Sequence, residues 1–165
     1  MTPAIAQYIS RTLGALEGRD PLAVLESTPD AIASRIAGRS ASQLHARPAP
    51  DKWSIAEVLA HLSEGEIVIG FRIRLILGAN GAPIQPFDQD AWAVRYAGMP
   101  VSQSLEVFRV VRAANVALLR SLSDAQWEQY GLHAERGRES IAQIARMAAG
   151  HDLNHLKQLE SMLLG

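Results

Sequence analysis

Apolar residues recur every three or four positions through most of the chain, which is the spacing of an amphipathic α-helix. Proline and glycine cluster between these stretches and mark connections. The pattern predicts a short helix over residues 3–17 and four principal helices, which cover residues 20–37 (or 28–37), 54–78, 102–122 and 140–164.

The helix over residues 54–78 carries the strongest signals. Ser54 and Glu57 form a Ser-x-x-Glu capping box ahead of apolar residues at helical spacing. Ser140 is predicted to cap the last helix. In the helix over residues 102–122, the stripe expected to face inward comprises Leu105, Phe108, Val111, Ala114 or Asn115, Leu118 and Leu122.

Connections are predicted at residues 39–52, 78–100 and 130–139. The second is rich in glycine and proline and long for a compact domain, and such connections are often functional. It also allows the second and third long helices to run parallel, whereas a short loop would force them antiparallel. We therefore expect an all-α fold, a four-helix bundle with a long crossover, in a single domain (1–165) whose residues 1–19 form an N-terminal extension helix.

Composition narrows the classes of function. The 165 residues are 48% hydrophobic, enough for a sizeable core. The 16 Lys and Arg residues nearly balance 17 Asp and Glu residues, so the basic surplus of a nucleic-acid binder is absent. The lack of cysteine excludes disulfides, thiolate ligands and a cysteine nucleophile, so any thiol must come with a substrate. No apolar run is long enough for a membrane span and no signal peptide is recognised, so we expect a cytoplasmic protein.

Three histidines are the main candidates for chemistry. His151 and His155 lie four residues apart, so their imidazoles project from one face of the predicted helix and interrupt its apolar stripe. The neighbouring Asp152 points away from that face and is not assigned to the site. His61, in the helix over residues 54–78, would supply a third ligand, and a three-histidine site leaves a coordination position open, as in catalytic zinc sites.

Each of these histidines also has an ordinary interpretation. A histidine pair at this spacing more often makes hydrogen bonds than binds a metal, although two neighbouring inward imidazoles are costly without partners. Gly65, one turn after His61, either leaves room for a pocket or allows close packing of helices. His45 is expected to be solvated, and His133 either helps to form the pocket or is an exposed loop residue.

The segments around these histidines resemble a known family. Residues 52–62 (KWSIAEVLAHL) and 151–155 (HDLNH) resemble the DinB-like superfamily. Residues 70–77 (GFRIRLIL), the segment 83–92 and the His133-x-Glu135 loop resemble its YfiT-like branch. The resemblance spans roughly residues 20–163 and implies an up-down-down-up bundle, a homodimer, and a zinc or nickel centre whose ligands are His61, His151 and His155.

The resemblance further implies a divalent-metal-dependent enzyme. Some relatives are described as hydrolases, and others transfer a low-molecular-weight thiol such as bacillithiol, mycothiol or glutathione to a small-molecule substrate. A three-histidine metal would lower the pKa of bound water or of a bound thiol, and either would then serve as nucleophile. The alternative is a non-catalytic module for ligand binding or dimerisation, in which the metal stabilises the fold.

Other side chains are weaker candidates for catalysis. Glu64 would act as a base or as a partner of the metal site, or is an ordinary surface glutamate. Arg72 and Arg74 would hold an anionic substrate through bidentate contacts, unless they are solvated or paired with Asp88 or Asp90.

Overall fold

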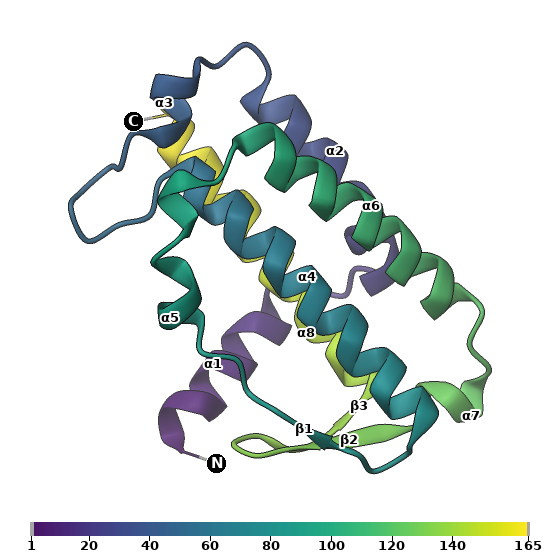
Figure 1. Cartoon of the computed structure of the whole chain (residues 1–165). Coiled ribbons are helices and arrows are strands. Elements are labelled where there is room, and N and C mark those ends of the chain that lie inside the picture. The colour runs from purple at the N-terminus through teal and green to yellow at the C-terminus, as the bar shows by residue number, and fades with distance from the viewer. Residues whose placement is uncertain (1, 165) are drawn as a thin grey trace.

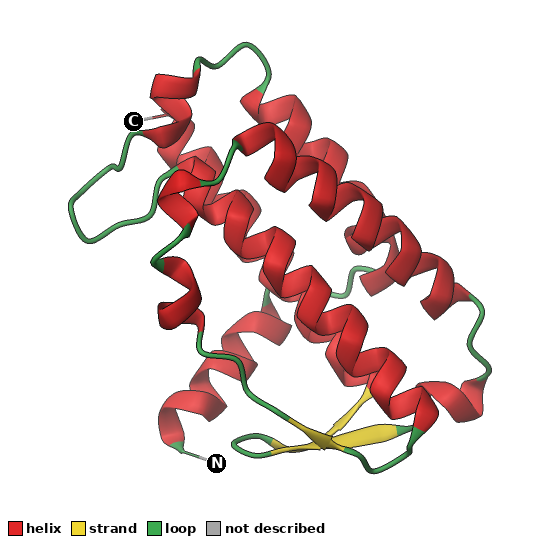
Figure 2. Cartoon of the chain, in the orientation of Figure 1, coloured by secondary structure: helices red, strands yellow, loops and turns green. Residues whose placement is uncertain are grey.

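The computed structural model describes residues 2–164, and most of them lie in helices (Figures 1 and 2). The bundle comprises four long helices: α2 (Pro21–Ile36), α4 (Ile55–Gly78), α6 (Val101–Arg120) and α8 (Ile141–Leu164). Helix α4 contacts α6 and α8, and α2 contacts the same two helices. Figure 1 shows that α4 and α6 run in one direction along the bundle, while α2 and α8 run in the other.

Shorter helices occupy the remaining segments: α1 (Pro3–Gly14), α3 (Ala41–His45), α5 (Gln89–Ala93), the 3₁₀ helix η1 (Tyr96–Gly98) and α7 (Asp124–Trp127). The predicted capping box of α4 is present, because the Ser54 backbone N–H donates to Glu57 (2.8 Å) and the Glu57 N–H donates to the Ser54 hydroxyl (3.3 Å). Ser140 accepts from the Gln143 N–H at 3.1 Å, as a cap of α8 does.

The expectation of an all-α fold is wrong at one end of the bundle, where Figure 2 shows a small sheet. Strand β1 (Pro83–Ile84) pairs parallel with β2 (Tyr130–His133), and β2 pairs antiparallel with β3 (Gly137–Ser140). These strands lie in segments predicted to be connections. They hold only two to four residues each, too few for an alternating pattern to identify them.

Two apolar clusters fill the bundle, and a polar layer lies between them. One cluster includes Leu59 and Phe108, and the other includes Ile73 and Leu119. Between these positions α6 buries Arg112 and Asn115, whereas Ala114 is exposed and Val111 is only partly buried. Of the two alternatives predicted for the inward stripe of α6, Asn115 is confirmed and Ala114 is wrong. The stripe omitted Arg112, whose ion pairs occupy the centre of the buried face.

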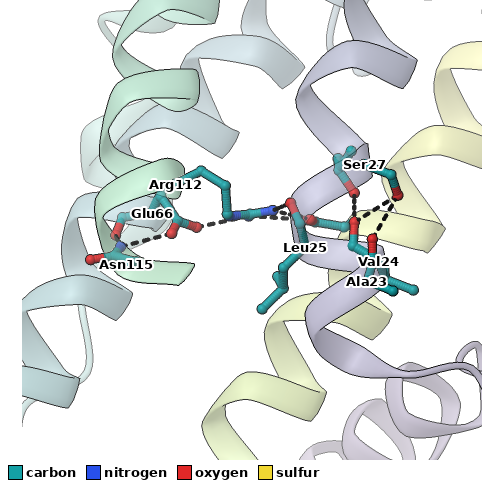
Figure 3. Close-up of polar contacts among 9 residues, drawn as sticks. Ala23, Val24, Leu25, Ser27, Glu66, Arg112 and Asn115 are labelled. Carbon is teal, nitrogen blue, oxygen red and sulfur yellow. Dashed lines mark hydrogen bonds and ion pairs between the residues drawn. The ribbon is translucent and has the colours of Figure 1, made fainter. Parts of the chain in front are cut away.

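Arg112 is the centre of this polar layer (Figure 3). Its guanidinium donates to Asp152 (2.5 and 3.2 Å), to Glu66 (2.7 Å) and to the carbonyl oxygen of Leu25 (2.9 Å). Asn115 donates to the same Glu66 carboxylate at 2.7 Å. The network ties α2, α4, α6 and α8 together, and Asp152 lies in it rather than on the face of α8 that carries His151.

Within residues 2–164, no helix combines the length and the hydropathy that a membrane span requires.

Candidate metal centre

The structure brings the three predicted histidines together. Nε2 of His151, on α8, lies 3.0 Å from Nε2 of His61, on α4, and 3.0 Å from Nε2 of His155. Their candidate ligand atoms all lie within 4.8 Å of one another. His61 is buried and the other two are half-buried, so the cluster opens toward solvent from the side of α8.

A contact with Gln158 fixes the tautomer of one imidazole. Nδ1 of His155 lies 2.8 Å from Oε1 of Gln158, and the amide oxygen can only accept, so Nδ1 carries the proton. In the neutral ring, Nε2 is then unprotonated and turns its lone pair toward His151. A metal-ligating histidine is oriented in this way by the partner of its other nitrogen.

Protons alone satisfy this cluster poorly. Nε2 of His151 has two close neighbours of its own kind, but a single ring nitrogen either donates one hydrogen bond or accepts one. At most one of the two 3.0 Å contacts is then a well-formed hydrogen bond. A divalent cation accepts all three lone pairs at once, so this donor set fits a metal ion such as zinc, which nitrogen ligands bind at about 2.0–2.1 Å.

Burial keeps the three imidazoles neutral. It lowers the pKa of His61 to about 3, with a further contribution from nearby His155. The pKa of His151 lies well below its ordinary value, because of burial first and then the other two histidines. The pKa of His155 is also lowered by burial, against the opposing effect of Gln158. Neutral imidazole is the form that ligates a metal, so protons compete weakly for this site near pH 7.

A cavity of about 130 Å³, open to solvent, adjoins the cluster on the His61 and His151 side. A Cβ atom at Gly65 would meet no described atom within 4 Å, so this glycine leaves space in the cavity and its close-packing interpretation is wrong. The Trp53 ring lies 5.2 Å from the His61 ring and 5.6 Å from the ring of Tyr96, between centroids. These two aromatic side chains form a wall beside His61.

Helix α1 also contributes to the site, which the sequence did not indicate. Tyr8 lines the cavity from α1, and α1 contacts α8 directly. The contact is close at Gly150, where an added Cβ would lie 2.0 Å from the carbonyl oxygen of Thr12. A glycine within a predicted helix, next to His151, was the available signal for this approach.

The weaker candidates have mixed outcomes. Glu64 is half-buried beside Tyr96, and burial together with the Glu64 carboxylate raises the pKa of Tyr96. This position beside Tyr96 gives no support to a role of Glu64 as a base. Arg72 is buried, lines the cavity and donates to the carbonyl oxygen of Gln85 at 2.6 Å. Arg74 is exposed and donates to Asn115 at 2.7 Å. The expectation that these arginines are solvated or pair with aspartates of the long connection was therefore wrong for Arg72.

The two remaining histidines differ from each other. His45 is exposed, as expected. His133 is buried, so its interpretation as an exposed loop residue is wrong. The reason is the unpredicted sheet, in which His133 pairs with Ile84 of β1 and with Gly137 of β3.

Comparison with known proteins finds similar chains that are named as candidate metal-dependent hydrolases. The chain is 25% identical over 139 residues to OB0782 of Oceanobacillus iheyensis, which is named as a candidate metal-dependent hydrolase. The aligned region covers 84% of this chain and 81% of that protein. YfiT of Bacillus subtilis, named in the same way, is 26% identical over 134 residues, with 79% and 75% of the two chains covered.

A solved structure supports the fold. The structure of YfiT from Bacillus subtilis, described as a probable metal-dependent hydrolase with an unusual four-helix bundle topology, matches with a TM-score of 0.80 at 22% identity, over 86% of this chain and 83% of that one. The family model of the DinB superfamily matches residues 25–159, which include all three clustered histidines. The chain therefore belongs to the DinB superfamily.

Proposed function

We propose that this protein is a metal-dependent hydrolase in which His61, His151 and His155 hold a divalent zinc or nickel ion. The observation that carries the proposal is the convergence of three Nε2 atoms, 3.0 Å apart across His151, at the wall of an open cavity. The names of the relatives OB0782 and YfiT, which call them candidate metal-dependent hydrolases, agree with it.

When bound by three neutral imidazoles, a divalent ion supplies Lewis acidity, which lowers the pKa of a nucleophile and polarises a substrate carbonyl. The protein's own residues prepare the site. Gln158 holds the proton of His155 on Nδ1 and so keeps Nε2 available as a ligand atom. Trp53 and Tyr96 cover one side of His61 with aromatic surface, and the cavity beside Gly65 provides the space for a small-molecule substrate.

Transfer of a small thiol is a second candidate function for the same site. The chain has no cysteine, so a thiol nucleophile would have to enter with a co-substrate. The cavity is open to such a molecule. Water and an external thiol would both be activated by a metal on the same three histidines. The two reactions are distinguished by measuring turnover of a thiol together with an electrophile, and separately turnover of an ester or amide without thiol.

Elemental analysis of the untagged protein tests the metal centre. We expect close to one zinc or nickel per chain, lost in each of the variants His61→Ala, His151→Ala and His155→Ala. The matched control is His45→Ala, which removes an exposed histidine away from the cluster and should leave the metal content unchanged. Equal metal in all four variants would refute the centre.

Activity and stability separate an enzyme from a structural metal site. Turnover of an ester or amide panel by metal-loaded protein, lost on chelation and in His151→Ala, supports the hydrolase. A variant that loses only thermal stability, in a protein inactive on esters, amides and thiol–electrophile pairs, supports instead the non-catalytic module. The expected homodimer stays a prediction, which sedimentation velocity would test.

A further inference from the structure

The cavity beside the histidines has a second polar end. Along α4, His61, Gly65, Val68 and Arg72 follow one another at spacings of four, three and four residues, so they lie on one face, and all four line the cavity. Eleven residues separate His61 from Arg72, which is roughly 16 Å along the helix axis. The cavity is therefore elongated, with the histidine cluster at one end and a guanidinium at the other.

The Arg72 guanidinium has unused hydrogen-bonding capacity. The side chain is more than nine-tenths buried, with 8% of the residue exposed. Nη2 donates to the Gln85 carbonyl oxygen at 2.6 Å, but Nε is buried with no partner among residues 2–164. A buried charged donor without an acceptor is unfavourable, so a ligand that accepts from it would bind with a gain in free energy.

A second arginine faces the same end of the cavity from the turn between β2 and β3. Arg136 donates to the buried carboxylate of Glu139 through Nε (2.6 Å) and Nη2 (2.9 Å), and both residues line the cavity. Arg136 thus has one acidic partner, while Arg72 has none in direct contact among residues 2–164. Among the charged residues that line the cavity, the two arginines and Glu139 together carry a net charge of +1.

His133 lies near these charges, outside the set of residues that line the cavity. Its Nδ1 accepts from the backbone N–H groups of Glu135 (3.2 Å) and Arg136 (3.4 Å). In the neutral ring the proton is then on Nε2, which is buried and without a partner among the described residues. Burial lowers the pKa of His133, as do Arg136 and Arg72, against the opposing effect of Glu139 and the exposed Glu135. The ring therefore stays neutral and adds no charge to this end of the cavity.

We propose that this end of the cavity, centred on Arg72, is a subsite for a carboxylate, and that the substrate is an extended small molecule with one carboxylate remote from the bond that reacts. A single negative charge balances the net charge of the subsite. A planar carboxylate can accept two N–H donors of one guanidinium, which suits the unused face of Arg72. The position of the reacting bond near the histidines rests on the proposed function, whereas carboxylate binding at Arg72 does not.

The test uses hexanoate and its neutral counterpart hexanamide as probes, titrated calorimetrically into the full-length protein with the metal removed by chelation. We expect hexanoate to bind at least about tenfold more tightly than hexanamide. That preference should disappear in Arg72→Gln. It should persist in the matched control Arg74→Gln, which removes an exposed arginine two residues along the same helix.

Equal binding of the two probes to the wild-type protein would overturn the proposal without any variant, so the test holds even if Arg72→Gln fails to fold. A preference for hexanoate that survives in folded Arg72→Gln would overturn it as well. A preference seen only with metal, and lost in His151→Ala, would place the carboxylate on the metal and not on Arg72. Failure of the metal centre leaves the metal-free result unchanged, so the two proposals fail separately.

Discussion

Replacing Arg112 by methionine should strongly destabilise the fold, because it leaves two buried carboxylates without their cation. The Arg112 side chain is 3% exposed, and those of Glu66 and Asp152 are each 2% exposed. Methionine fills much of the volume but makes none of the four hydrogen bonds that the guanidinium donates. Breaking a buried pair by removing one partner typically costs about 3–5 kcal/mol.

The assay is urea unfolding of the metal-free protein, followed by circular dichroism at pH 7. The matched control is Arg120→Met, which also removes an arginine of α6 from a close ion pair. Arg120 lies 2.6 Å from Glu26, but both side chains are about half exposed, so this change should cost about 1 kcal/mol or less. Equal losses in the two variants, or a loss under about 1 kcal/mol in Arg112→Met, would refute the reasoning.

The pH dependence of Arg112→Met gives a second check. Burial raises the pKa of Glu66 even with Arg112 present, and removal of the cation should raise it further. Between the unfolded and folded pKa values the folded protein then binds more protons than the unfolded chain, so stability falls as pH rises. The deficit of the variant relative to wild type should therefore shrink between pH 7 and pH 5, and a constant deficit would contradict this account.

Three other predictions concern the site. Burial lowers the pKa of His61 to about 3, so between that value and pH 6.5 this residue binds a proton in the metal-free unfolded chain but not in the folded one. His61 should therefore contribute up to about 1.4 kcal/mol per pH unit to the fall in the free energy of unfolding on acidification, and the slope should be less steep in His61→Ala; equal slopes in urea titrations would refute this. Gly150→Ala should lower the free energy of unfolding by about 1–3 kcal/mol in thermal unfolding, because the added Cβ would lie 2.0 Å from the Thr12 carbonyl oxygen. The control Gly14→Ala places its Cβ in open space and should cause no loss of stability. Gln158→Leu should weaken zinc binding about 10- to 100-fold in competition with a chelating dye, and unchanged affinity would exclude its orienting role.

The long helices and the pair of His151 and His155 could be predicted because local rules determine them. The capping box of Ser54 and Glu57 identified the start of α4, and the spacing of His151 and His155 placed both rings on one face of α8. His61 was expected as a third ligand from another helix, and the resemblance to the DinB-like superfamily implied the full set. Its contact with His151, 90 positions away, joins two distant helices, and no local signal predicts it.

The sheet and the polar layer could not be predicted, because both depend on contacts between distant segments. Strand β1 pairs with β2 nearly fifty residues later, and neither is long enough to show a period. A single sequence gives no sign that Glu66, Arg112 and Asp152 are buried, because charged residues are usually solvated. Their contact with one another offsets the free-energy cost of burying them. Arg72 was predicted as a candidate for an anionic substrate, but the place of Arg136 at the same cavity depends on the sheet.

The 90 residues between His61 and His151 have a consequence for the order of folding. Residues so far apart meet late, because closing a long loop costs entropy before any contact forms. An unfolded chain offers at most the local pair on α8, which is a much weaker chelator than the complete triad. The apolar clusters on either side must therefore assemble the three rings without help from an ion, and metal would be captured only by chains whose α4 and α8 have already docked.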